Sequence, residues 1–436
     1  MHVENARNAD LVFILSMQGV PLMPCRPRKA RIFLSSGKAK VVRKTPFVIH
    51  LIFGSMGYLQ PITAGMDSGS KYIGCAAIAN GQVVYQAEIE LRNDVSSKLE
   101  QRRMYRRNRR NRKTRYRQPR FDNRGKEGKL APSIRSKVES HLREKKFVES
   151  ILPVQEWKVE LASFDIHKMS NPSVSKKHGW TYQNGKQKDF YNVKAYVLSR
   201  DEYLCQQCKN SKKSHLHVHH IKFRSDGGTD TPDNLITLCE SCHDKLHKGK
   251  LSNDVHEKLK KKTQSKTKHA TEIGIIQSRL KKSDWIFEET FGYETKFKRE
   301  GLELPKTHSY DAVAVCLADG ELIKHLDSVL LKKHVSKGDY KQTSGARSEK
   351  TIPTGKLYGL RKFDLVKTPR GSGFIKGKRS TGYFAITHLD GTKIHDSVNV
   401  KKNCLRIQAR TTTLTQKRMR LIPGLKAEVS AAEYIG

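Results

Sequence analysis

The sequence lacks the long apolar stretch of a membrane-spanning helix and has few acidic residues for its size. We find no run of about 18 apolar residues, and no signal peptide is expected. A soluble, cytosolic protein is therefore predicted. Asp and Glu total 43 against 84 Lys and Arg, so the formal net charge is +41. Such an excess predicts a polyanionic partner held through phosphate contacts, and nucleic acid is the expected class.

The chain is also longer than one hydrophobic core usually allows. Its 436 residues predict several structural units, which can be interleaved. Four of its cysteines form two Cys-x-x-Cys pairs, Cys205/Cys208 and Cys239/Cys242, and the other four are single. This usage is typical of a metal site rather than of a disulfide framework.

Hydrophobic periodicity and turn residues predict the main elements. Residues 62–91 are expected to form a hairpin turning at Asn80-Gly81. Residues 96–120 predict an arginine-dense helix that ends near Pro119, and helices are expected on both sides of the cysteine-rich segment. Strand and turn signals from about residue 345 onward favour a small β-barrel.

The two cysteine pairs predict a tetrahedral four-sulfur zinc site. Because four thiolates leave no position open for water, this zinc would be structural and would stabilise a module with little core. Four reduced, unligated cysteines are the alternative.

The histidines nearby predict a second metal site. His219 and His220 lie in a strand pattern and so face opposite ways, whereas His243 and His247 share one face of a helix expected to begin near Asn234. Imidazoles around one divalent cation, with a further histidine to deprotonate water, suit phosphodiester hydrolysis. The alternative is that they are surplus ligands of the zinc site. His215 and His217 fit neither pattern and are expected to be solvated.

The order His-His, Asn, Cys-x-x-Cys-His resembles the HNH, or ββα-metal, endonuclease family. The resemblance implies that His220 is the general base and that Asn234 fixes the catalytic loop. It implies His219 and His243 as ligands of a catalytic Mg²⁺ or Mn²⁺, with His247 as a third.

Three acidic segments form another candidate site. Asp67 lies in a strand that is followed by small residues, Glu160 lies in a second strand, and His308 and Asp311 lie three residues apart at a helix start. Three carboxylates from separate segments suit two Mg²⁺ or Mn²⁺ ions at a scissile phosphate. The set resembles the split RuvC-like nuclease of the RNase H fold, which implies catalytic roles for all four residues. Ordinary surface carboxylates are the alternative.

The arginine-dense helix is expected to bind RNA, because so many like charges repel one another without a polyanion. Tyr105 and Tyr116 could stack on bases or pack against the core. A localisation signal or a nonspecific basic run is the alternative. The arginines concerned are Arg102, Arg103, Arg106, Arg107, Arg109, Arg110, Arg112, Arg115, Arg117 and Arg120.

The whole arrangement, with "PLMP" at residues 21–24, resembles the IscB family of transposon-associated RNA-guided nucleases, which are related to CRISPR type II effectors. The resemblance implies a monomeric protein bound to a structured omega RNA, in the cytoplasm of a prokaryote and associated with the nucleoid when on its target. It implies that the HNH site cuts the guide-paired DNA strand and the RuvC-like site the displaced strand. The short stretch between Arg120 and Glu160 cannot hold the large helical lobe of the CRISPR effectors, so RNA would supply that scaffold.

The predicted fold is therefore α/β and multidomain, with a split RNase H-like core, a bridge helix, an inserted zinc-bearing HNH module and a C-terminal β-barrel. The expected segments are 1–58 (PLMP), 59–93, 123–196 and 253–335 (RuvC-like), 94–122 (bridge helix), 197–252 (HNH) and 336–436 (C-terminal domain).

The C-terminal domain is predicted to read DNA flanking the target, because basic and aromatic residues alternate in it. A barrel that only clamps the RNA is the alternative. The residues concerned are Tyr358, Arg361, Lys362, Phe363, Lys376, Lys378, Arg379 and Tyr383.

Two other functions remain open from the sequence. One is a protein-only HNH homing or restriction-type endonuclease, and the other is an RNA-binding protein with decayed nuclease sites.

Overall fold

The computed structural model describes residues 11–54, 57–110, 130–161, 190–209, 215–226, 230–249, 268–318, 323–326, 328–337, 356–379 and 381–419. The chain divides into two compact units, Met1–Ser163 with Ile273–Gly436, and Phe164–Glu272. The second unit is thus inserted into the first along the chain. Within the described part, every helix is too short or too polar to span a lipid bilayer.

A four-stranded sheet begins the first unit. Its strands, in spatial order, are β2 (Pro21–Cys25), β1 (Val12–Leu15), β4 (Val48–Leu51) and β3 (Ala39–Arg43). Helix α1 (Pro27–Ser35) starts at a proline, whose missing N–H is not needed in the first helical turn. Ala30 of α1 packs against Ile49 and Leu51, so the small sheet has its own apolar cluster.

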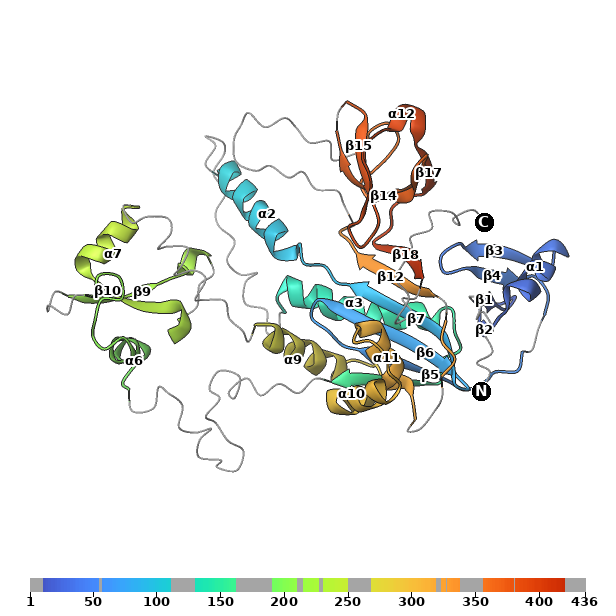
Figure 1. The fold of residues 1–436 in the computed structure, drawn as a ribbon, viewed down its shortest axis with the longest axis horizontal. Helices are drawn as coiled ribbons and strands as arrows, with labels where there is room; N and C mark the ends of the chain where they lie inside the picture. The colour runs from blue at the N-terminus through green and yellow to red at the C-terminus, as the bar shows by residue number, and fades with distance from the viewer. Residues whose placement is uncertain are drawn as a thin grey trace. The chain divides into compact units, whose positions relative to one another are not determined.

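A seven-stranded mixed sheet forms the centre of the first unit (Figure 1). Its spatial order is β11 (Glu288–Phe291), β8 (Glu156–Leu161), β5 (Ile62–Asp67), β6 (Tyr72–Ala79), β7 (Gln82–Glu90), β12 (Ser328–His334) and β18 (Thr413–Met419). The β6–β7 hairpin turns at Asn80 and Gly81, whose φ angles of 46° and 70° are the left-handed conformation that this dipeptide favours. Strand β18 lies within the range 336–436 expected for a separate domain, yet it pairs with β12 of this sheet.

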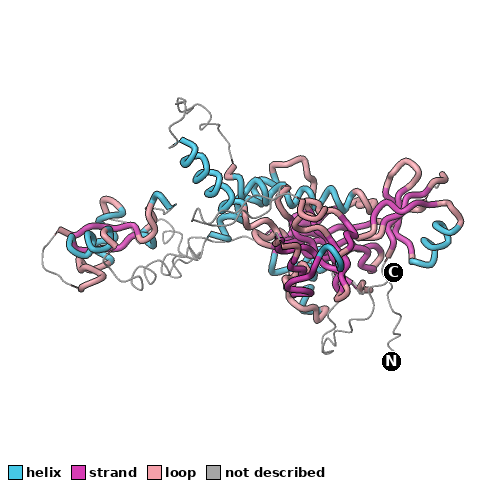
Figure 2. Tube along the Cα trace, turned by 90° about the horizontal axis from the view of Figure 1, so that it is seen from above, coloured by secondary structure: helices cyan, strands magenta, loops and turns pink. Residues whose placement is uncertain are grey.

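Helices cover both faces of the central sheet (Figure 2). α3 (Pro132–Glu149) packs on the face that holds Ile62, Ala64 and Met66. α11 (His308–Cys316) packs on the other face, where a Cβ added at Gly65 would lie 2.6 Å from the Ala312 carbonyl oxygen. Only glycine allows the α11 backbone to approach this closely. The small residues near Asp67 therefore allow the backbone of α11 to pack closely against the sheet.

The remaining helices of the first unit are α2 (Val95–Arg110), α9 (Lys268–Lys281) and α10 (Gly292–Gly301). α9 begins in the inserted unit and places Ile276 and Leu280 in the apolar core of the first unit. α10 follows the edge strand β11 directly and packs against α11 and β8.

The C-terminal region forms a five-stranded antiparallel sheet. Its order is β16 (Lys393–Asn399), β15 (Tyr383–Thr387), β14 (Gly371–Lys378), β13 (Leu365–Thr368) and β17 (Leu405–Gln408), with the short helix α12 (Val400–Asn403) before β17. Val366, Ile375 and Phe384 are buried in its core. Closure of these strands into the expected barrel stays a prediction.

The inserted unit contains a two-stranded sheet of β9 (Leu216–His220) and β10 (Leu235–Cys239) with α6 (Val193–Arg200) and α7 (Glu240–His247). Two 3₁₀ turns, Arg224–Asp226 and Pro232–Asn234, lie between the strands. The helix expected to begin near Asn234 begins instead at Glu240. The reason is that Leu235–Cys239 pair antiparallel with β9 and are all buried, which favours a strand.

Candidate active sites and metal centres

The four cysteines of the inserted unit come together as one cluster. The ligand atoms of Cys205, Cys208, Cys239 and Cys242 all lie within 4.8 Å of one another. The Sγ atoms of Cys208 and Cys239 are 3.8 Å apart, and sulfurs held about 2.3 Å from a tetrahedral zinc ion are separated by about 3.8 Å. The thiol positions therefore fit a structural zinc ion.

The electrostatics of this cluster also favour a cation. Burial raises the pKa of Cys205, but backbone N–H groups of Cys208, Cys239 and Gln207 lower it to about 7. Burial and hydrogen bonds with Cys239 and Cys208 raise the pKa of Cys242. Four neighbouring thiols cannot all ionise unless a positive charge offsets their repulsion, and zinc supplies that charge.

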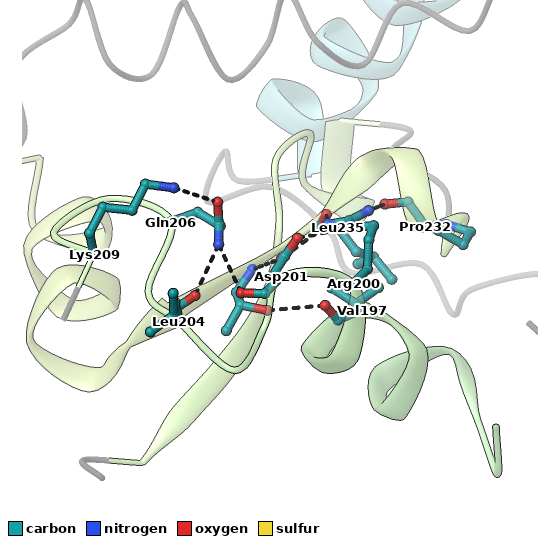
Figure 3. A network of polar contacts seen from close by, with 9 residues as sticks. Val197, Arg200, Asp201, Leu204, Gln206, Lys209, Pro232 and Leu235 are labelled. Atoms are coloured by element: carbon teal, nitrogen blue, oxygen red, sulfur yellow. Dashed lines mark hydrogen bonds and ion pairs between the residues drawn. The ribbon is translucent and has the colours of Figure 1, made fainter. Parts of the chain in front are cut away.

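A polar network holds the cysteine turn against β10 (Figure 3). Asp201, just after α6, accepts a hydrogen bond from the Thr237 backbone N–H at 2.9 Å. Arg200 donates to the carbonyl oxygens of Pro232 and Leu235 at 2.7 and 2.9 Å. These bonds hold the C-terminal end of α6 against β10, the strand that carries Cys239.

Three histidines form a second cluster beside the strands. Ligand nitrogens of His219, His243 and His247 lie within 4.8 Å of one another, and the Nε2 atoms of His243 and His247 are 3.2 Å apart. Burial, with His247 and His217 nearby, lowers the pKa of His243. A neutral imidazole keeps a lone pair for a metal, so this donor set fits a divalent cation.

His217 is exposed, as expected, and it also contacts this cluster. Its ring stacks on His243 with centroids 5.0 Å apart and planes at 25°. The register explains this contact, because His217 and His219 lie two residues apart and so share one face of β9.

The neighbouring His220 faces a loop carboxylate. Its Nε2 atom lies 2.7 Å from Asp230 Oδ1, and Arg224 donates to the same oxygen at 2.8 Å. Asn234 is buried and bonds the backbone of Lys222 through both side-chain atoms, at 2.9 and 3.0 Å. The amide thus fixes the turn that follows His220.

The acidic residues of the first unit meet beneath the start of α11. Asp67 and Glu160 are direct partners in the parallel β5–β8 pair, so both side chains face α11. His308 Nδ1 lies 2.5 Å from Asp67 Oδ2, and Tyr72 stacks on the His308 ring. Asp311 forms an ion pair with Arg299, whose Nε lies 3.0 Å from Asp311 Oδ1. The fold therefore brings the four sequence-predicted residues to one place.

Burial and mutual repulsion disfavour the ionised carboxylates here. Burial and then Asp67 raise the pKa of Glu160 to about 7. The same two causes raise the pKa of Asp311, while the hydrogen bond to Asp67 raises that of His308. Hard oxygen donors with such repulsion suit Mg²⁺ or Mn²⁺.

The carboxylates are nonetheless not gathered as closely as the thiols or imidazoles. Among the described residues, the sets of three or more ligand atoms within 4.8 Å are the cysteine and histidine clusters. The carboxylates instead engage side chains, Asp67 with His308 and Asp311 with Arg299. Arg299 carried no motif signal in the sequence, and neither did Asp230. The packing of α10 against α11 and the fold of the loop after β9 bring them to the sites.

The predicted nucleic-acid residues are largely at the surface. Arg102, Arg103, Arg106, Arg107 and Arg110 are exposed on α2, whose backbone includes Arg109, whereas Arg112, Arg115 and Arg117 lie outside the described residues. In the C-terminal sheet, Arg361, Lys376 and Arg379 are exposed, and Lys362 and Lys378 are partly exposed.

Comparison with known proteins adds independent information. Residues 12–185 match the RRXRR protein family, and residues 205–249 match the HNH endonuclease family. Over 74 residues the chain is 36% identical to the type IV methyl-directed restriction enzyme EcoKMcrA of Escherichia coli, covering 15% of this chain and 27% of that enzyme. Over 62 residues it is 42% identical to anaredoxin of Nostoc sp., covering 14% of this chain and 78% of anaredoxin.

Proposed function

Because this chain contains an HNH endonuclease domain and is a DNA-cleaving hydrolase, we propose that it is an RNA-guided nuclease of the IscB type with two separate cleavage sites. The observation that carries the proposal is the pairing of Asp67 with Glu160 under α11 in a chain that also holds an HNH domain. In this proposal the HNH site cuts the guide-paired strand, and the carboxylate cluster cuts the displaced strand.

At the HNH site the chain's own residues hold and move protons. His220 takes a proton from the attacking water, and Asp230 accepts the proton of the other ring nitrogen and so fixes the tautomer. His219, His243 and His247 would hold a divalent cation, which stabilises negative charge on the phosphate oxygens. Asn234 keeps the turn after His220 in place.

At the carboxylate cluster, Asp67, Glu160 and Asp311 would hold Mg²⁺ or Mn²⁺, which would neutralise their repulsion and activate water. His308 donates to Asp67 and sets the direction of that carboxylate. Arg299 must share Asp311 with the metal or release it. The parallel β5–β8 pair keeps the two central acids adjacent.

An omega-type RNA is the proposed guide and scaffold. The net charge of +41 and the exposed arginines of α2 support a polyanion of this size, and the match to the arginine-rich RRXRR family supports nucleic-acid binding. Sequence specificity would then come from base pairing.

The C-terminal sheet is the proposed reader of target-flanking DNA. Replacing Arg361, Lys362, Lys376, Lys378 and Arg379 one at a time, and selecting cleavable targets from a randomised flank, tests this role. A relaxed preference at one flank position supports it. A uniform loss of cleavage with unchanged preference assigns these residues to RNA or phosphate contacts.

A restriction-type enzyme is the second candidate, because part of the chain is similar to EcoKMcrA. Purification of the chain from its native host under moderate salt separates the two. A defined co-purifying RNA of at least about a hundred nucleotides, required for cutting, supports the proposal. Specific cutting by RNA-free protein supports the restriction-type enzyme.

A further inference from the structure

An aromatic surface lies on the edge strand β11 and helix α10. We call Phe291, Tyr293 and Phe297 the aromatic face. Tyr293 is 71% exposed and Phe297 80% exposed. The rings of Phe291 and Tyr293 are nearly parallel, at 8° with centroids 6.1 Å apart. Large apolar rings exposed together mark an interaction site more often than scattered ones do.

The aromatic face lies on the helix that borders the carboxylate cluster. On the inner side of α10, Thr295 lies close enough to Glu160 to offset part of the rise in pKa that burial causes in that carboxyl, and Arg299 pairs with Asp311. Tyr293 and Phe297 are one turn apart and lie on the opposite side of the same helix. A strand that reaches the cluster would therefore pass this helix a few nucleotides from the reacting phosphate.

Three of the four acidic residues of β11 and α10 lie within ion-pair distance of a lysine. The acidic residues of β11 are already paired, since Glu288 lies 3.2 Å from Lys158 and Glu289 lies 2.6 Å from Lys281. Lys296, between the two exposed rings in sequence, lies 3.8 Å from Glu300, and Glu294 follows Tyr293 directly in the sequence. Flat parallel rings match the faces of unpaired bases, on which they can stack.

We infer that the aromatic face stacks unpaired bases of a DNA strand next to the carboxylate cluster. The inference rests on the proposed role of that cluster, and it defines the substrate there as single-stranded DNA. The bases would be bound without sequence preference, because every base offers a π-face.

Photo-crosslinking tests the contact independently of cleavage. The full chain is mixed with a thymidine oligonucleotide carrying 5-iododeoxyuridine, in salt high enough to weaken phosphate contacts, and the crosslinked residue is identified by peptide sequencing. We expect crosslinks at the aromatic face. The double change Tyr293→Leu and Phe297→Leu keeps apolar bulk but removes the rings, and should lower that yield about tenfold or more.

Two controls make the outcome decisive. Tyr58→Leu removes a ring that is 99% exposed elsewhere in the same unit and should leave the yield unchanged, and Phe297→Trp should retain it. Crosslinks confined to other residues, full yield in the double variant, or crosslinking of a uridine RNA but not of DNA would each overturn the inference. If crosslinking persists while Asp67→Ala leaves both cuts intact, the aromatic face stands and the proposed role of the cluster fails.

Discussion

At the scale of single residues, two contacts at the candidate sites link a histidine to a carboxylate. His220 faces Asp230 across a loop, and His308 faces Asp67 across two elements. In each pair the carboxylate limits which ring nitrogen carries the proton. The pairs differ in setting, because Asp230 is exposed and Asp67 is largely covered.

Asp230→Asn should slow guide-paired strand cutting. The amide cannot hold the His220 tautomer as the carboxylate does, so we expect a loss of about tenfold or more in kcat with little change in KM. Single-turnover cleavage of a strand-labelled duplex measures this. Asp233→Asn, an exposed acid of the same loop, is the matched control. Equal effects of the two changes on kcat would show that Asp230 has no specific role at the site.

Lys332→Met should strongly destabilise the first unit. Lys332 and Glu144 are 1% and 2% exposed and 2.7 Å apart, and Tyr85 donates to the same Glu144 oxygen. Loss of one partner leaves a buried charge, which costs about 3 to 5 kcal/mol. Urea unfolding followed by fluorescence of the buried Trp157 and Trp285 reports the change.

The neighbouring Lys333 provides the control, because its pair with Glu90 is partly exposed. Lys333→Met should cost at most about 1 kcal/mol. A similar loss of unfolding free energy in both variants would show that the buried ion pair stabilises the unit no more than the partly exposed pair does.

At the scale of elements, the sequence predicted local patterns better than distant contacts. The cysteine spacing, the Asn80-Gly81 turn and the hairpin depend on neighbouring residues, and each has the expected place in the structure. The predicted start of α7 was wrong, because antiparallel pairing with β9 makes Leu235–Cys239 a strand. Arg299 and Asp230 depend on how separate segments pack, and no local pattern encodes that.

Cys208→Ser should remove zinc and unfold the inserted unit, since metal binding contributes much of the stability of so small a module. Guide-paired strand cutting should be lost, while cutting by the first unit partly survives. Elemental analysis and strand-specific cleavage measure the two effects. Cys404→Ser, outside this cluster, should keep zinc. Well-folded wild-type protein without zinc would contradict the assignment.

Gly74→Ala should impair the carboxylate cluster through α11. The added Cβ would lie 1.6 Å from the His308 carbonyl oxygen, so the helix must move and His308 must leave Asp67. We expect the rate of displaced-strand cutting to fall at least about tenfold, because misplacing a reacting group by a small distance causes losses of this size. Gly274→Ala adds a methyl group to α9 with no atom within 4 Å and should be neutral. Unchanged cutting in Gly74→Ala would contradict the close approach.

At the scale of the whole molecule, the proposed function requires two sites in two separately folded units. The histidine cluster belongs entirely to Phe164–Glu272, and Asp67, Glu160, His308 and Asp311 belong to the other unit. Each site therefore has its own supporting core. Inactivation of one site should leave the other folded and competent.

Strand-resolved cleavage of a guide-matched duplex by the RNA-loaded protein tests this most directly. His220→Ala should abolish cutting of the guide-paired strand only, and Asp67→Ala should abolish cutting of the displaced strand only. Omission of the RNA should abolish both. Loss of both cuts in either single variant that still binds its target, or guide-independent cutting by the wild-type protein, would contradict the account.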